Sequence, residues 1–429
     1  PGACCAGRPF HGGEGEAVLK QMRAVEREGE RREAFVLLLM LLTVYTLIWI
    51  MIGRSPFQGS IYDSYALQAS RWLEGHLDLG RTYSYLEIAE YNGRYFISFP
   101  PIPSVLLLPF CVLFGESPPD TLVAVALGLL GAVYALKMAR MAGRRGAAAV
   151  FWAFFVTAGS NFLHVGFSAD VWYFAQTASF AFTMISLCYA MDEEVKHGWA
   201  PLLFLALAFG CRPLQIVYLP LVALLLLQKL RGQGVAPVQA LKQYRWWLLP
   251  PLAVGSGLMA LNAARFDDPF QFGHDYLPEF AVEKADGQFS LAYLAGNWAR
   301  LWRLPGMENG RLRFPTFDGC AFWLFSPIFL VFAVYLLRNL RGLRREPAVP
   351  LTVGLILLQF AALCCHATMG GWQFGNRYTI DALPALYTAL TLLQKRDESD
   401  LQPLAVPLCL WGVGLNLTGT VALFNGWLP

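Results

Sequence analysis

The stretch 34-AFVLLLMLLTVYTLIWIMI-52 contains no charged residue. It is long enough to cross the hydrocarbon core of a bilayer, which takes about 17–25 apolar residues. The whole chain shares this character, with 56% hydrophobic residues, 15% charged residues and a mean hydropathy of +0.44. One water-soluble core could not bury so much apolar surface. We therefore expect an all-α, polytopic integral membrane protein, and a net charge of only +3 gives no indication of a nucleic-acid partner.

Further apolar runs predict the other membrane spans. Seven are long: 120–139, 146–164, 170–190, 246–264, 319–337, 349–367 and 403–424. Three are shorter: 199–211, 214–228 and 379–393. Run 100–115 is also short but contains FPPIPSVLLLPF, and each proline removes a backbone donor that a lipid-exposed helix must satisfy. We expect it to be re-entrant or to lie on the surface, which leaves about eleven spans.

Basic residues set the expected orientation, because short cytoplasmic loops are rich in Lys and Arg. The cluster before the first span places the N-terminus in the cytoplasm, and the later clusters agree if 100–115 is not a span. These first two clusters are Lys20, Arg23, Arg27, Arg31 and Arg32, then Arg140, Arg144 and Arg145. Two long loops, 53–119 and 265–318, then lie outside, carry juxtamembrane helices and form the functional face.

The expected domain organisation has three parts. Residues 1–33 form a disordered cytoplasmic tail, residues 34–396 the main transmembrane domain, and residues 397–429 a C-terminal segment with the last span.

The first outer loop opens with 61-IYDSYALQASRWLEGHLDL-79, in which Asp63 heads an amphipathic segment between Tyr62 and Tyr65. A carboxylate at the hydrocarbon boundary can have its pKa raised by desolvation or lowered by a nearby cation, and either state suits acid/base chemistry. The alternative is that Asp63 only caps a helix over 64–75. Candidates for a second acidic group are Glu87, Glu90 and Asp170.

Two arginines stand at the outer ends of predicted spans. Arg212 lies in FGCRPLQ between two half-length helices, and Arg377 lies in MGGWQFGNRYTID before the tenth span. A planar guanidinium at this depth suits a phosphate, although both could instead be structural partners of nearby carboxylates. The glycines around Trp372 would let backbone approach a ligand. No CxxC or HExxH motif indicates a metal site, and His164 with Asp170 is a weak ligand pair.

Taken together, several stretches resemble the GT-C superfamily of polyprenyl-phosphate-dependent membrane glycosyltransferases. YDSYALQASRWLEGHLDL is similar to their first periplasmic loop, and YNGRYFISFPPIPSVLLLPFCVLFG to the "NGKYY…PPGPALLLLP" block of bacterial relatives of protein O-mannosyltransferases and aminoarabinose transferases. LAFGCRPLQIVYLP, LNAARFDDPFQFGHDY and MGGWQFGNRYTIDALPAL resemble later blocks, so the resemblance spans most of residues 34–390.

This resemblance implies a GT-C-like fold and an inverting hexosyl- or pentosyltransferase in a bacterial inner membrane. The donor would be a polyprenyl-phosphate-linked sugar, and the acceptor an extracytoplasmic protein, lipid or cell-envelope glycan. Asp63 matches the catalytic carboxylate, and Arg377 and Arg212 match positions that meet the lipid phosphate. The substrate cavity would include Tyr62, Tyr65, Tyr91, Arg94, Trp372 and Asp381.

Some questions stay open at this level. The need for a divalent metal, Mg or Mn, is undecided. A polysaccharide polymerase or ligase would keep the enzyme class and change the donor. A flippase or transporter of lipid-linked glycans is the alternative from another class, although transporters usually show paired broken helices, and here one broken pair, at Arg212, is visible.

Overall fold

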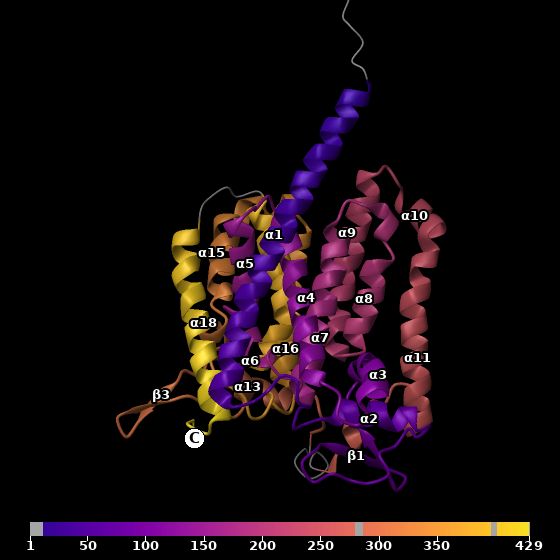
Figure 1. Cartoon of the computed structure of the whole chain (residues 1–429), viewed down its shortest axis with the longest axis vertical. Helices are drawn as coiled ribbons and strands as arrows, with labels where there is room; N and C mark the ends of the chain where they lie inside the picture. Colours follow the sequence, from indigo (N-terminus) through magenta and orange to yellow (C-terminus); the bar gives the residue numbers. More distant parts are fainter. Residues whose placement is uncertain (1–11, 279–285, 396–400, 429) are drawn as a thin grey trace, which may run out of the picture.

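The computed structural model describes residues 12–278, 286–395 and 401–428 as a bundle of roughly parallel helices (Figure 1). Seven helices in it are long and apolar enough to cross a membrane. They are formed by α1 (Gly12–Ile52), α4 (Asp120–Met141), α7 (Val171–Met191), α9 (Leu219–Gly232) with η2 (Pro213–Tyr218), α11 (Leu249–Phe266) with α10 (Pro237–Tyr244) and η3 (Arg245–Leu248), α16 (Ala348–Cys365), and α18 (Gln402–Phe424). The protein is therefore a multi-pass membrane protein.

The other four predicted spans are built from shorter pieces, so the count of eleven stays a prediction. These pieces are α5 (Ala147–Thr157) with α6 (Phe162–Val165), η1 (Val195–His197) with α8 (Ala200–Phe209), α14 (Phe322–Phe325) with α15 (Ile328–Arg338), and η7 (Arg377–Ala382) with α17 (Leu383–Gln394).

Two of the helix breaks satisfy each other's polar groups inside the bundle. Asn161, between α5 and α6, receives a backbone hydrogen bond through its Oδ1 from Asn376 and donates through Nδ2 to the Phe374 carbonyl and to Asn416 of α18. Its own N–H donates to Ser326 Oγ, between α14 and α15, at 3.0 Å. Non-helical backbone at membrane depth is tolerated only where protein supplies such partners.

Helix α7 lies at the centre of the bundle, and 89% of its apolar, membrane-spanning stretch is buried. It packs against α4 through small residues, because a Cβ at Gly131 would lie 3.0 Å from the Phe180 ring and 3.2 Å from the Ala181 backbone. Close approach of this kind is a common way of packing helices in membranes. The polar side chains on α7 are therefore held on a rigid element.

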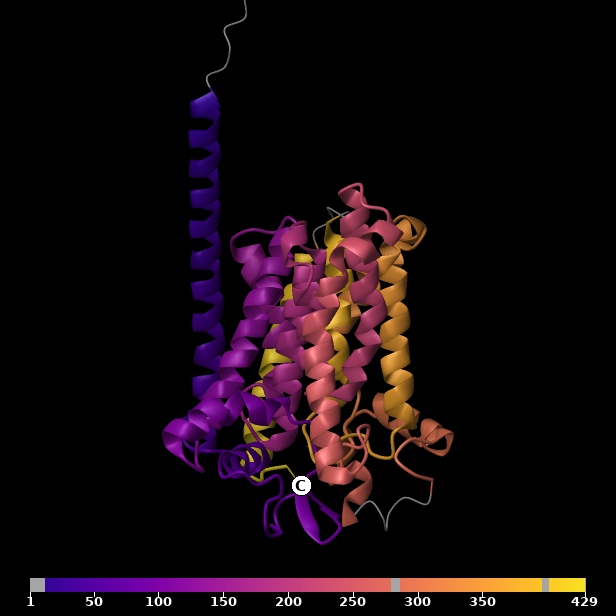
Figure 2. The same cartoon turned by 90° about the vertical axis from the view of Figure 1, so that its right-hand side faces the viewer.

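The two long loops lie at the same end of the bundle, which we call the loop end. It carries α2 (Ser64–Leu73), α3 (Ile102–Phe114), η4 (His274–Tyr276), η5 (Leu291–Tyr293), α13 (Leu294–Trp302) and two hairpins, β1 (Ile88–Tyr91) with β2 (Arg94–Ile97), and β3 (Gly306–Glu308) with β4 (Arg311–Arg313). Helix α3, from the proline-rich run, lies beside α2 rather than passing through the bundle (Figures 1 and 2).

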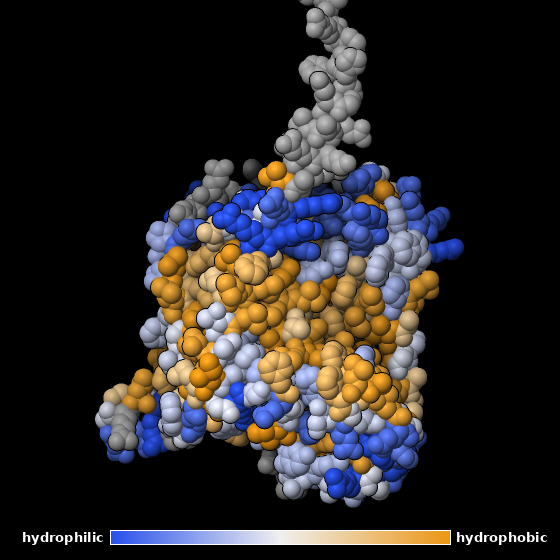
Figure 3. Space-filling model, viewed as in Figure 1, coloured by the Kyte–Doolittle hydropathy of each residue, from blue (hydrophilic) through white to orange (hydrophobic). Residues whose placement is uncertain are grey.

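The opposite end, which we call the basic end, carries hydrophilic residues above an apolar belt (Figure 3). Arg140 Nη1 lies 2.6 Å from Glu33 Oε2, and Arg145 Nη2 lies 3.2 Å from Glu26 Oε1. The cluster at 140–145 therefore lies on the same side as the N-terminal part of α1, as the exclusion of 100–115 from the spans predicted.

The structure differs from the sequence expectation in two places. Residues 12–33 form the N-terminal part of α1 instead of a disordered tail, while residues 1–11 lie outside the described part. The fold is helical overall, but each of the two long loops also contains a hairpin, at Asn92-Gly93 and at Asn309-Gly310. Asn-Gly favours the type I′ turn, whose backbone twist matches that of paired strands.

Candidate functional site

Asp63 occupies the N-cap position of α2, but its side chain makes no capping hydrogen bond. Its carbonyl accepts from the N–H groups of Ala66 and Leu67, and its carboxylate Oδ1 is buried without a hydrogen-bond partner among the described residues. Burial raises the pKa of Asp63, while its own backbone N–H and the Tyr85 hydroxyl favour the charged form and partly offset this. The Asp63 carboxylate therefore does not cap α2, and its Oδ1 could accept a proton or bind a cation.

Asp170 lies next to this segment, because Val171 N donates to the Tyr62 carbonyl at 3.1 Å, and the Tyr62 and Trp172 rings are 4.9 Å apart. Asp170 is 3% exposed, and its Oδ1 also has no hydrogen-bond partner among the described residues. Arg54, just past the end of α1, lies 3.9 Å from its other oxygen. The start of α7 therefore brings the two predicted acidic groups of the loop end into one neighbourhood.

One side of α7 connects this neighbourhood to the second arginine. Every third position from the N-cap of α7 carries a polar side chain, namely Asp170, Tyr173 and Gln176. Residues at this spacing lie along one side of a helix. The Tyr173 hydroxyl lies 3.2 Å from His164 Nε2. Gln176 Nε2 donates to the Arg377 carbonyl at 2.9 Å, and Arg377 Nη1 donates to Gln176 Oε1 at 3.4 Å.

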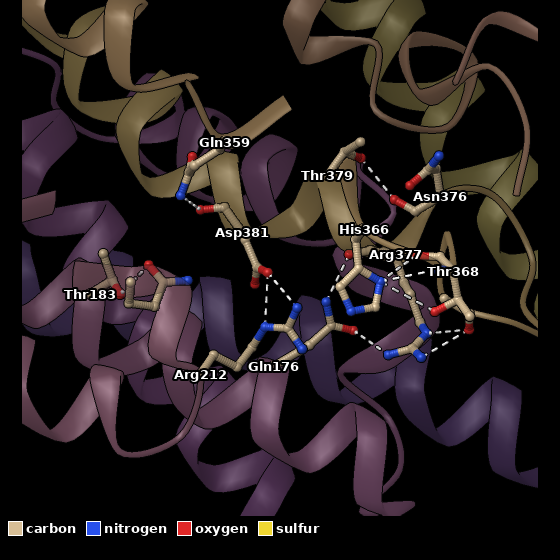
Figure 4. A network of polar contacts seen from close by, with 12 residues as sticks. Gln176, Thr183, Arg212, Gln359, His366, Thr368, Asn376, Arg377, Thr379 and Asp381 are labelled. Carbon is tan, nitrogen blue, oxygen red and sulfur yellow. Dashed lines mark hydrogen bonds and ion pairs between the residues drawn. The ribbon is translucent and has the colours of Figure 1, made fainter. Parts of the chain in front are cut away.

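Arg377 is 5% exposed and makes no ion pair with a described carboxylate. Its Nε and Nη2 donate to the Gly370 carbonyl at 3.1 and 2.9 Å (Figure 4). Gly370 has a φ of 107°, a conformation that a residue with a side chain rarely adopts. A neutral carbonyl and an amide therefore make the hydrogen bonds to this cation, and the Asp381 carboxylate acts on it only at longer range.

Arg212, in contrast, is a structural partner of a nearby carboxylate. Its Nη2 lies 2.7 Å from Asp381 Oδ2, and the Asp381 carboxylate is buried (Figure 4). Tyr378 joins the two arginines, because the guanidinium carbons of Arg212 and Arg377 lie 5.1 and 4.7 Å from the centre of its ring. Cation–π contacts of this kind hold a guanidinium over an aromatic face.

The loop that holds Arg377 is supported by a second loop along a seam of backbone hydrogen bonds. Gln373 N donates to the Thr316 carbonyl, Asp318 N to the Gly371 carbonyl and Cys320 N to the Gly375 carbonyl, at 2.8, 2.9 and 3.1 Å. We call this the 316–375 seam. It fixes a glycine-rich loop that would otherwise have many conformations.

The remaining predicted site residues divide into two groups. Tyr65 lies near Arg212, with a buried hydroxyl that has no hydrogen-bond partner among the described residues, and the Trp372 ring packs 6.2 Å from Phe424, whose ring also lies under Arg54. Tyr91 and Arg94 are engaged elsewhere, since Tyr91 donates to Asp267 and Arg94 pairs with Asp78.

The two first-loop glutamates lie on or beside the same hairpin. Glu90 is exposed on β1, and Glu87 is partly buried just before this strand. Among the described residues, the side-chain hydrogen bonds of Arg377 go to Gly370 and Gln176 and not to Glu90.

Sequence reasoning missed three residues at the loop end. Arg54 was overlooked as a flank of the first span, and Asp120 as the first residue of the second, where its carboxylate accepts hydrogen bonds from Ser60 N and Oγ at 2.9 and 2.6 Å. Arg265 lies in the last turn of α11, is 2% exposed and donates to the Ile97 carbonyl and to Asn262 Oδ1. Their position at the ends of apolar runs was the available signal.

Donor type alone makes Asp63 and Asp170 suitable ligands for Mg²⁺ or Mn²⁺, since each offers a carboxylate oxygen without a partner. Among the described residues, the group of three or more ligands with mutually close atoms is Asp192, Glu194 and His197, which lies at the basic end, where Lys196 already pairs with Glu194. Any metal at the loop end would thus rest on one or two protein carboxylates and on ligands from a substrate.

Comparison with known proteins supports the fold. No family model and no curated protein matches the sequence. Apo ArnT from Cupriavidus metallidurans is 14% identical and has a TM-score of 0.50, over 87% of this chain and 62% of that one. ArnT bound to undecaprenyl phosphate gives 15% and 0.49 with the same coverage, and the apo Archaeoglobus fulgidus oligosaccharyltransferase gives 12% and 0.47, over 91% and 56%.

The chain spans about three fifths of the length of the ArnT chain. The likeness to apo ArnT shows that the two chains share a fold, which confirms the predicted all-α, multi-pass membrane architecture.

Proposed function

We propose that the chain is an integral-membrane glycosyltransferase that moves a sugar from a polyprenyl-phosphate donor to an extracytoplasmic acceptor. One observation carries the proposal: α7 connects, at the loop end, a carboxylate with one oxygen left unbonded among the described residues and a buried guanidinium that forms no direct ion pair with a described carboxylate. These are Asp63, through its neighbour Tyr62, and Arg377, through Gln176. The fold adds support, because ArnT, which shares it, has been solved with undecaprenyl phosphate bound.

The reaction needs these two charges in different roles. The bond between the anomeric carbon and the phosphate oxygen breaks, and a bond from the acceptor oxygen forms on the opposite face, which inverts the configuration. The acceptor proton goes to Asp63, whose raised pKa makes the carboxylate a better base than an ordinary aspartate. Positioned acid/base catalysis of this kind contributes about 10²–10⁴ in rate.

The leaving group gains negative charge as the bond breaks. Arg377 stabilises the phosphate, and its fork is held by Gly370 and Gln176 before the donor arrives, so little reorganisation is required. Arg212 adds positive charge across Tyr378, although part of it is balanced by Asp381. A divalent cation, if bound by Asp63 and Asp170, would supply further positive charge beside the phosphate.

We also propose that the basic end is cytoplasmic, by the positive-inside rule, and that the membrane is a bacterial plasma membrane. The loop end then faces outward, where a lipid-linked sugar and a water-side acceptor meet. The N-terminus, linked to the 140–145 cluster by Glu26 and Glu33, would lie in the cytoplasm.

The test is transfer by purified protein reconstituted in vesicles. Radiolabelled polyprenyl-phosphate sugars are incubated with the protein and with membrane fractions as acceptors, and label is followed from donor lipid to product. Transfer that is lost in Asp63→Asn supports the proposal. Label that crosses the vesicle membrane while still on its lipid would instead indicate a flippase.

A further inference from the structure

The β3–β4 hairpin, residues 306–313, is a second feature of the loop end that the proposed function does not use. Its turn is Asn309-Gly310, with φ values of 52° and 73°. In Figure 1 it projects sideways from the bundle, beyond the helices. A two-stranded hairpin on its own is only marginally stable in water, so a projecting hairpin needs another surface to support it.

The strand register gives the hairpin one apolar and one charged face. Met307 lies opposite Leu312 across the strands, and both side chains therefore point to the same face. They are 70% and 57% exposed. Glu308 and Arg313 point to the other face, where Arg313 Nε lies 2.7 Å from Glu308 Oε2. Thus the ion pair lies on one face, and two large apolar side chains stand open on the other.

Hydrogen bonds at the base of the hairpin hold it next to the start of α14. Ala321 N donates to the Arg303 carbonyl at 2.8 Å, and Arg303 Nη2 donates to the Phe317 and Gly319 carbonyls, both at 2.8 Å. These bonds close the hairpin segment at Ala321, directly before α14. The hairpin therefore leaves the bundle where a predicted span begins, and the six residue steps from Arg303 to Asn309 span at most about 20 Å at roughly 3.3 Å per step of extended chain.

Two exposed tryptophans precede the hairpin in the chain, and one of them contacts the start of α14. Trp298 and Trp302 of α13 lie immediately before the hairpin, 52% and 45% exposed, with ring centroids 5.7 Å apart. The Trp302 ring also packs 5.5 Å from Phe322, the first residue of α14. Exposed tryptophans are enriched at membrane–water interfaces, where an apolar ring and a polar N–H are both accommodated.

We infer that the β3–β4 hairpin is a membrane-surface anchor: Met307 and Leu312 insert into the lipid leaflet at the loop end, while Glu308 and Arg313 stay at the water side. The lipid surface is the occupant that fits, because the hairpin connects α13, which carries two exposed tryptophans, to α14, where a predicted span begins. This anchor is independent of the proposed transferase activity and holds for any function of the chain.

The anchor is tested by site-directed fluorescence in reconstituted protein. Met307→Cys and Leu312→Cys are labelled with an environment-sensitive dye and compared with Glu308→Cys, a neighbouring position on the charged face. The unsubstituted protein measures background labelling, since the native cysteines in the described part of the chain are buried or partly buried. Vesicles of phosphatidylcholine contain either spin-labelled lipids or no quencher, and iodide is added in water.

Dyes at 307 and 312 should show blue-shifted emission, several-fold stronger quenching by the spin-labelled lipids than the dye at 308, and weaker quenching by iodide. Equal iodide quenching at all three positions would mean that the hairpin lies in water and overturns the inference. Shielding of 307 and 312 from both quenchers would indicate contact with protein and overturns it as well.

Discussion

Arg212 and Asp381, 169 residues apart in the chain, form an ion pair in which Nη2 and Nε of the arginine lie 2.7 and 2.8 Å from the same carboxylate oxygen. The pair joins the turn between α8 and α9 to η7, directly before α17. The Asp381 carbonyl accepts further hydrogen bonds from Tyr218 and Gln359. One pair therefore ties three parts of the bundle together at the depth where the donor phosphate would bind.

A double-mutant cycle tests this pair. Asp381→Asn and Arg212→Gln should each lower the free energy of unfolding, by up to about 3–5 kcal/mol for a fully buried partner and by less here because Arg212 is partly exposed. The double variant should lose less than the sum, with a coupling of about 0.5–3 kcal/mol in denaturant titrations of detergent-solubilised protein. Additive losses would show that the pair contributes no specific interaction.

Asp63→Asn should reduce sugar transfer by about 10² or more while donor binding is largely kept, because the change removes the proton acceptor and preserves the shape. Asn would also serve as an N-cap, so a capping role predicts little change. Initial rates and donor KM measure the effect, with Asp286→Asn, an exposed loop position, as the matched control. An active Asp63→Asn protein would exclude Asp63 as the base.

The raised pKa of Asp63 also predicts how its stability effect depends on pH. A carboxyl whose pKa is higher in the folded state than in the unfolded state favours folding at low pH, and this contribution is lost as pH rises through the folded pKa. At neutral pH the Asp63 carboxylate therefore disfavours the folded state. Asp63→Asn should melt at the same or a higher temperature than wild type at pH 7, and the difference should shrink toward acidic pH. A variant less stable at pH 7 contradicts this.

Arg377→Lys should raise the donor KM by about tenfold or more, since hydrogen bonds to charged groups contribute about 1.5–3 kcal/mol and lysine lacks the planar fork. Arg212→Lys is the comparison and should have the smaller effect, because Asp381 already occupies that guanidinium. Steady-state kinetics over a range of donor concentrations separate KM from turnover. Equal effects at the two positions would place the phosphate between both arginines.

Helix α18 offers a matched pair of glycines. A Cβ at Gly419 would lie 1.9 Å from the Phe374 ring, whereas a Cβ at Gly414 meets nothing within 4 Å. Gly419→Ala should destabilise the protein by about 1–3 kcal/mol through overpacking next to the 316–375 seam. Gly414→Ala should be neutral or stabilising by up to about 1 kcal/mol. Thermal unfolding in detergent checks both, and an unaffected Gly419→Ala would mean that Phe374 can move aside.

Cysteine labelling tests the orientation. In a Cys-free background, an impermeant maleimide added outside should react at Asn92→Cys, in the β1–β2 turn, and at Asp286→Cys, and fail at Arg144→Cys at the basic end. Each site becomes reactive once the membrane is opened with detergent, which controls for buried thiols. Labelling of position 144 from outside would reverse the proposed orientation.

The sequence predicted the features that depend on local composition. Apolar runs gave the long spans, the prolines of 100–115 indicated a helix outside the bundle, and Asp63 was placed at the head of α2. The two hairpins could have been found from Asn92-Gly93 and Asn309-Gly310, although the first was interpreted only as part of a family block.

Pairings between distant segments could not be predicted, because no local pattern connects Arg212 to Asp381 or Gln176 to Arg377. For the same reason the structural and phosphate-binding interpretations of the two arginines could not be separated. Asp63 shows a related limit: residue type favoured a cap, but the tertiary contacts of α2 leave its side chain free of that role.

The 316–375 seam has a consequence for how the bilayer and the site communicate. The hairpin enters at Arg303 and leaves into residues 314–320, whose backbone is bonded to the loop that ends at Arg377. If the hairpin inserts into the leaflet and Arg377 binds the donor phosphate, as proposed above, a change in lipid packing or thickness would move residues 314–320 and, through the 316–375 seam, the loop that holds Arg377. Donor affinity would then depend on the surrounding lipids as well as on the residues that contact the phosphate.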